Sequence, residues 1–139
     1  MKQYLSIIIL FGILSSVSVF GQKEFKKLEE TENVVFYYKW KPSKFLKKDS
    51  PLVLILRIEN QNAHAINISF STDYFWDGIR KATSDDQEYC IKANKKIKGK
   101  LKGLGFDTSV FSNDQIMNSR FQMEVNGIEI KEVDNCFKK

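Results

Sequence analysis

Apolar and polar residues alternate along most of this chain with the period of two that is typical of half-buried β-strands. Residues 66–71 show the pattern most cleanly, because Ile66, Ile68 and Phe70 are separated by asparagine and serine. No long segment has the period of an amphipathic helix. The strand at 66–71 is predicted to continue through residues 74–76. Further strands are predicted at residues 34–40, 52–59, 79–83, 88–93, 95–102, 121–125 and 128–130.

Two turn sequences join these segments. Asp77-Gly78 precedes the segment at 79–83, and Asn126-Gly127 lies between two alternating segments. Asn-Gly supplies the two positive-φ residues of a type I′ turn, so residues 121–130 are predicted to form a hairpin. Seven or eight short strands at intervals of about 8–12 residues indicate an all-β, antiparallel sandwich.

The first 21 residues have the layout of a secretory signal peptide. Lys2 is followed by an apolar run from Leu5 to Leu14 and then by small residues, so we expect cleavage between Gly21 and Gln22. The alternative is a retained membrane anchor, but the run from 4 to 20 is shorter than the ~20 apolar residues that a spanning helix needs. The protein is therefore predicted to be exported to the periplasm, the cell surface or the medium, without a membrane span after cleavage.

Removing 21 of the 139 residues leaves 118, which supports one domain over residues 22–139. The net charge falls from +5 to +4 with the loss of Lys2, and this modest excess does not indicate a nucleic-acid ligand. We expect a monomer. Cys90 and Cys136 are the two cysteines, and in an exported domain they predict one disulfide that closes a long loop. Two buried free thiols are the alternative.

Several short segments carry a resemblance to a protein class. They are Phe20-Gly21-Gln22, residues 34–40 (VVFYYKW), residues 56–60 (LRIEN), Lys98-Gly99-Lys100 and Asp134-Asn135-Cys136. On these segments the chain is similar to small bacterial exported proteins of unknown function with one immunoglobulin-like or fibronectin-III-like domain. The resemblance implies an immunoglobulin-like β-sandwich and supplies no active-site residues that could be assigned to this sequence. Such folds host many unrelated functions.

No residue set predicts catalysis, a cofactor or a metal centre. His64 is the only histidine and lies in the turn after residue 60, with no partner indicated by the sequence. Four aspartates lie in or near predicted turns, without the alternating acidic pattern of a calcium loop. They are Asp73, Asp77, Asp85 and Asp86.

A row of lysines is the candidate binding surface. On a strand over 95–102, four of them would point the same way at intervals of about 7 Å. They are Lys96, Lys98, Lys100 and Lys102. Such a row can hold a sulfated or phosphorylated polymer or acidic headgroups. The alternative, which we favour, is that the lysines guard an edge strand against pairing with another molecule.

A second candidate surface is aromatic. Tyr37, Tyr74, Phe75 and Trp76 could form a platform that stacks on sugar rings. The alternative, favoured for Trp76, is a place in the core. These observations predict a non-catalytic exported module that binds or supports a macromolecule such as a protein or an anionic glycan. A small enzyme or enzyme inhibitor acting through its loops is the alternative.

Overall fold

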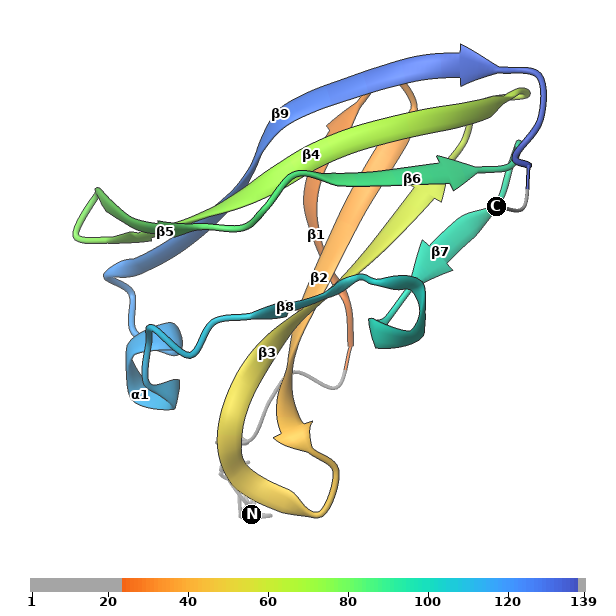
Figure 1. Cartoon of the computed structure of the whole chain (residues 1–139). Helices are drawn as coiled ribbons and strands as arrows, with labels where there is room; N and C mark the ends of the chain where they lie inside the picture. Colours follow the sequence, from red (N-terminus) through yellow and green to blue (C-terminus); the bar gives the residue numbers. More distant parts are fainter. Residues whose placement is uncertain (1–23, 138–139) are drawn as a thin grey trace, which may run out of the picture.

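The structure, a computed structural model, describes residues 24–137. The predicted leader, residues 1–21, lies outside this range. Nine strands, one short α-helix and one 3₁₀ turn make up the described chain (Figure 1). The elements are β1 (Lys26–Thr31), β2 (Val34–Lys44), β3 (Lys47–Asn60), β4 (Ala65–Trp76), β5 (Ile79–Thr83), β6 (Gln87–Ile91), β7 (Lys96–Lys98), η1 (Lys100–Lys102), β8 (Gly105–Asp107), α1 (Asn113–Ile116) and β9 (Phe121–Val133).

The strands form two antiparallel sheets packed as a sandwich. One sheet has the order β1-β2-β3-β7, and β8 pairs with β3 beside β7. In the other sheet β4 pairs with β5 and β6 along one side and with β9 along the other. The predicted all-β antiparallel sandwich is therefore confirmed, with nine strands among the described residues in place of seven or eight.

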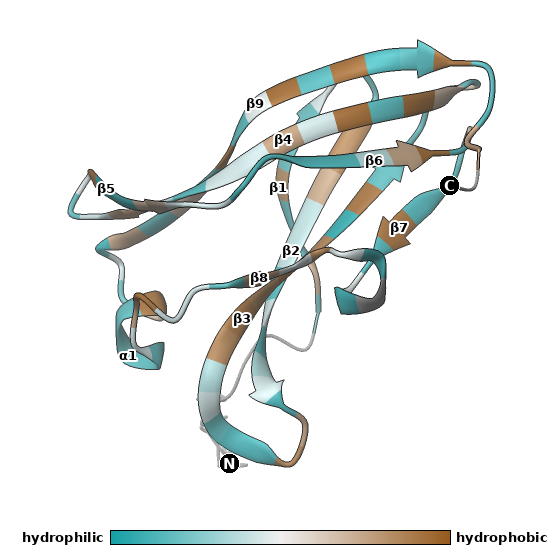
Figure 2. Cartoon of the chain, in the orientation of Figure 1, coloured by the Kyte–Doolittle hydropathy of each residue, from teal (hydrophilic) through white to brown (hydrophobic). Residues whose placement is uncertain are grey.

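The core lies between the sheets and follows from the alternation in the sequence. Hydrophobic and hydrophilic bands alternate along β4 and β9 (Figure 2). Phe36 on β2 and Phe70 on β4 meet edge to face across the interface, with ring centroids 5.3 Å apart. The central part of β3 is buried on both faces, because Ile55 on the outer face is covered as well as Leu54 and Leu56 on the inner face. A strand of this kind has a continuous apolar sequence.

The predicted disulfide is confirmed. Cys90 lies on β6 and Cys136 follows the end of β9, and their Cα atoms are 5.5 Å apart. Strands β6 and β9 flank β4 on opposite sides, so the bridge joins the two sides of this sheet across one end. It also holds the segment that follows β9.

The predicted hairpin at Asn126-Gly127 is wrong. Strand β9 runs without a reversal from Phe121 to Val133 and pairs with β4 along its length. The pairing changes from Ser69 with Glu129 to Ser71 with Asn126, so β9 carries one extra residue there. Gly127 has φ +61° within this bulge. A positive-φ glycine serves a bulge as well as a turn, and the sequence alone does not separate the two.

The positive φ of Gly127 in this bulge predicts that its replacement destabilises the protein. Gly127→Ala should lower the free energy of unfolding by about 1 kcal/mol, because an L-residue is strained at positive φ. A clash is not expected, since no atom lies within 4 Å of the added Cβ position. Denaturant unfolding checks the value. Gly127→Asn is the control and should lose less, because asparagine tolerates this conformation; equal losses from both variants would contradict the conformational explanation.

Candidate anion-binding groove

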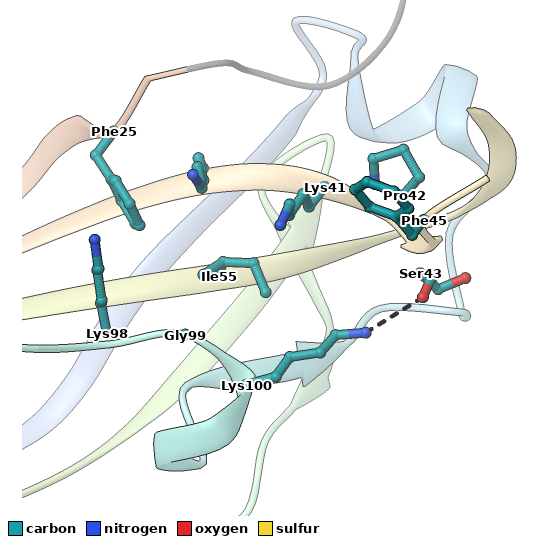
Figure 3. A pocket seen from close by; sticks show the side chains of 10 residues that line it. Phe25, Lys41, Pro42, Ser43, Phe45, Ile55, Lys98, Gly99 and Lys100 are labelled. Carbon is teal, nitrogen blue, oxygen red and sulfur yellow. Dashed lines mark hydrogen bonds between the residues drawn. The ribbon is translucent and has the colours of Figure 1, made fainter. Parts of the chain in front are cut away.

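A groove of about 490 Å³ crosses the outer face of the sheet that contains β2, β3 and β7 (Figure 3). Four of the residues that line it are lysines, and none is acidic. Phe25, Pro42 and Ile55 supply apolar surface. We call this site the basic groove, and its charged residues are Lys39, Lys41, Lys98 and Lys100.

Strand register brings the lysines of β2 to the groove. Phe36 and Trp40 face the core, so Tyr37 and Lys39, which alternate with them along β2, face outward. Lys39 pairs with Ile55 on β3, and Lys41 lies two residues further along the same face. The next β3 residue on this face, Arg57, pairs with Lys98 on β7. Three strands therefore place cations on one surface.

The predicted strand over 95–102 is only partly formed, and this changes the predicted lysine row. Strand β7 ends at Lys98, and the chain then turns through Gly99 and Gly103, whose φ angles are +83° and +74°. The turn is held by hydrogen bonds from the Gly99 amide to the Leu56 carbonyl and from the Leu104 amide to the Gly99 carbonyl. A straight row of four lysines is therefore not present.

Only two of the four lysines of the predicted row line the groove. Lys98 and Lys100 line the groove, and the Lys100 ammonium lies 3.5 Å from the Ser43 carbonyl oxygen on β2 (Figure 3). Lys96 pairs instead with Glu59 on β3, and Lys102 lies in η1 outside the groove lining. The structure thus joins two residues of the row to two lysines that the sequence analysis did not select.

Electrostatic repulsion is built into the groove. Burial lowers the pKa of the half-buried Lys39 ammonium. Repulsion from Lys41, Lys98 and Arg57 lowers this pKa further. The Lys39 nitrogen lies 4.4 Å from the centroid of the Phe25 ring, a cation–π contact that offsets part of the cost. A bound anion would relieve the remaining repulsion.

Arg57 is fixed between two aromatic rings beside the groove. Its guanidinium carbon lies 4.8 Å from the Phe25 ring centroid and 4.2 Å from that of Tyr37. Glu59 approaches within 3.2 Å of Nε, but Nε is buried and lacks the geometry of a hydrogen bond. Arg57 is therefore a cation beside the groove that contacts two aromatic rings and is ion-paired with Glu59.

The histidine and two of the four aspartates that the sequence analysis set aside as sites have local partners. His64 lies in the turn before β4, and its Nε2 is 3.7 Å from Glu132 on β9. Asp73 is buried and accepts hydrogen bonds from Thr83 and Asn126. Asp77 pairs with Arg120, which lowers the pKa of the Asp77 carboxyl chiefly through its hydrogen bonds. No group of three or more histidine, cysteine or acidic side chains that could hold a metal occurs within residues 24–137.

The aromatic residues considered as a platform lie in different environments. Tyr74 is buried in the core, whereas Phe75 and Trp76 are only half-buried. Trp76 lies at the edge of the core beneath the Arg120 guanidinium, 4.9 Å from it, so it is not the central core residue that was expected. Trp40 has that role and is 4% exposed.

Comparison with known proteins does not place the chain in a family. Searches of protein-family models, curated proteins and solved structures return no match. Within the part of the chain that the structure describes, no helix has the length and apolar character needed to cross a membrane.

Proposed function

We propose that this chain is an exported, non-catalytic module that binds an anionic glycan through the basic groove. The observation that carries the proposal is the convergence of four lysines from separate segments on a hollow that no carboxylate lines. Cations on one face normally occur with acids between them, because like charges side by side are destabilising. Their accumulation here is explained by a ligand that carries the opposite charge.

The apolar part of the groove favours a glycan over a small inorganic anion. Phe25 and Ile55 line the same hollow as the lysines, and Phe25 presents an aromatic ring. A sugar ring has apolar C–H faces, and its sulfate, phosphate or carboxylate groups carry the charge. A polymer with repeated charged groups can contact lysines on β2 and on the β7–η1 segment at once. Several weak contacts then add up to a higher affinity than one contact gives.

Export and an immunoglobulin-like relationship are part of the same proposal. The leader sequence over residues 1–21 and the disulfide between Cys90 and Cys136 support an oxidising destination. The two-sheet sandwich supports the resemblance to immunoglobulin-like exported domains at the level of architecture. The structural partners of His64 and Asp73 support a role without catalysis.

Paired lysine substitutions test the groove. Lys98→Gln with Lys100→Gln should weaken binding to heparin, a sulfated glycan, by about tenfold at 0.1 M salt, where the Debye length is about 10 Å. Lys39→Gln with Lys41→Gln should have a similar effect, although these lysines lie on another strand. Titration by fluorescence or calorimetry measures the affinity. At 1 M salt the difference from the natural protein should disappear.

The same lysine row supplies a matched control. Lys96→Gln with Lys102→Gln removes the same charge from the same segment but outside the groove, so binding should change less than about threefold. If all three pairs of substitutions weaken heparin binding equally, binding in the groove is contradicted and only a general electrostatic attraction remains. Since β7 is an edge strand, aggregation of the Lys98 and Lys100 variant with its affinity retained would show that these lysines guard the edge.

A further inference from the structure

The end of the β2–β3 hairpin exposes two large apolar side chains. Lys44 pairs with Lys47, so Phe45 and Leu46 form the two-residue turn between the strands. Phe45 is 92% exposed and Leu46 is 89% exposed, the highest values among the exposed large hydrophobic residues. The hairpin extends past the other strands of both sheets (Figure 1). We call Lys44–Lys47 the hairpin tip.

Folding does not explain the choice of these residues. Two-residue hairpin turns favour asparagine, aspartate and glycine, which suit the backbone and keep the turn polar. Phe45 and Leu46 contribute neither to the turn chemistry nor to the core. Where an exposed turn departs from the residue preference of its turn type, a functional requirement is indicated. The requirement that fits is a partner that covers both side chains.

Two hydrogen bonds to Ser50 hold the tip in this position. The Ser50 hydroxyl accepts a hydrogen bond from the Lys44 amide at 3.1 Å and donates one to the Lys47 carbonyl at 2.7 Å. Ser50 itself is 6% exposed. The apolar pair is therefore presented by a hydrogen-bonded turn, so little conformational freedom is lost when it docks.

Basic residues surround the apolar pair. Lys44 and Lys47 flank it directly, and Lys41 and Lys100 lie on the adjoining groove, which Phe45 also lines. Between residues 41 and 51 the only acidic residue is Asp49. An apolar centre with a cationic rim matches the boundary of a bilayer, where acyl chains lie beneath negatively charged headgroups.

We infer that the hairpin tip docks the protein on a membrane that carries anionic lipids. Phe45 and Leu46 enter the acyl boundary, while the flanking lysines contact the headgroups. A second copy of the chain is a poorer occupant, because tip-to-tip contact would bring the lysines of one copy against those of the other. This inference goes beyond the glycan proposal and does not depend on it.

Vesicle flotation with the purified protein tests the inference. Vesicles of equal parts phosphatidylglycerol and phosphatidylcholine should bind the protein, and phosphatidylcholine alone should bind it far less. Phe45→Ser with Leu46→Ser should lower the partition coefficient by at least about tenfold, because both insertion groups are lost. Ile79→Ser with Val110→Ser is the matched control, since it removes exposed apolar residues elsewhere and should change binding less than about threefold.

A direct readout separates insertion from general attraction. In a Phe45→Trp variant, emission should shift to the blue on anionic vesicles and be quenched by bromine on the acyl chains. Leu46 does not line the basic groove, so a single Leu46→Ser variant should lose part of its vesicle binding but keep its thermal stability and its affinity for heparin. Failure of this inference is therefore distinguishable from failure of the groove proposal. Unchanged vesicle binding in the double serine variant, or an unshifted emission spectrum of the Phe45→Trp variant, would overturn membrane docking. A change from dimer to monomer without a loss of vesicle binding would assign the tip to a second copy.

Discussion

Replacing Cys90 and Cys136 together with serine is expected to lower the free energy of unfolding by about 4 kcal/mol. The two cysteines are 46 residues apart in the sequence, and the bridge restricts the unfolded chain by closing this long loop. In the folded state it also joins β6 to the segment after β9, across one end of the sheet. Without it, the segment that follows β9 would lose its covalent cross-link to β6.

Urea denaturation of the double variant measures this loss, and reduction of the natural protein is the matched control. A reducing agent should destabilise the natural protein by a similar amount and leave the serine variant unchanged. Because domains of this size are stable by about 5–15 kcal/mol, the reduced protein should remain folded under mild conditions but unfold at lower urea. If the double variant loses less than about 1 kcal/mol of its free energy of unfolding, the bridge does not stabilise the protein by restricting the unfolded chain.

Most of the strands were predictable because each of them carries its own pattern, whereas β1 lies in a charged segment without one. Residues 66–71 alternate between apolar and polar side chains whatever strand they pair with. The central part of β3, residues 52–56, is continuously apolar because it is buried on both faces. The disulfide followed from the number of cysteines. The failure at Asn126-Gly127 has a different cause, because positive φ fits both a turn and a bulge, and only the pairing partner on β4 decides between them.

The basic groove could not be predicted, because it depends on register. Lys39 and Lys98 are far apart in the sequence and are brought together by the pairing of β2 with β3 and of β3 with β7. Alternation predicted that Lys39 and Lys41 point outward, but not which strand would lie beside them. The even spacing of lysines after residue 95 was also misleading, since Gly99 ends the strand after two of them.

The hairpin tip did have a signal in the sequence. Phe45-Leu46 lies between lysines, in a segment that was interpreted only as a lysine-bearing loop. Apolar residues in a predicted turn without glycine or asparagine are unusual, and this contrast could have selected the pair. Their exposure, however, depends on the hairpin extending past the sandwich, which the pairing of β2 and β3 determines.

The second large effect is expected in the core, at Phe70. Phe70→Ala should lower the free energy of unfolding by about 3–5 kcal/mol, since it removes a buried ring and leaves a cavity. Phe70 is 1% exposed and lies at the centre of an aromatic cluster. Its ring stacks on that of Tyr89 at 5.7 Å and contacts Phe36 across the sandwich, so its loss weakens both its own sheet and the packing between sheets.

Phe45→Ala is the control, because it makes the same chemical change at a ring that is 92% exposed. Its cost should stay within about 0.5 kcal/mol. Denaturant unfolding measures both values, and similar slopes against denaturant would show that the unfolded states are equally exposed. Equal losses from the two variants would place Phe70 outside the core or Phe45 inside it. The contrast also bears on the hairpin tip: if Phe45 contributes nothing to folding, its retention at the turn needs the partner that membrane docking supplies.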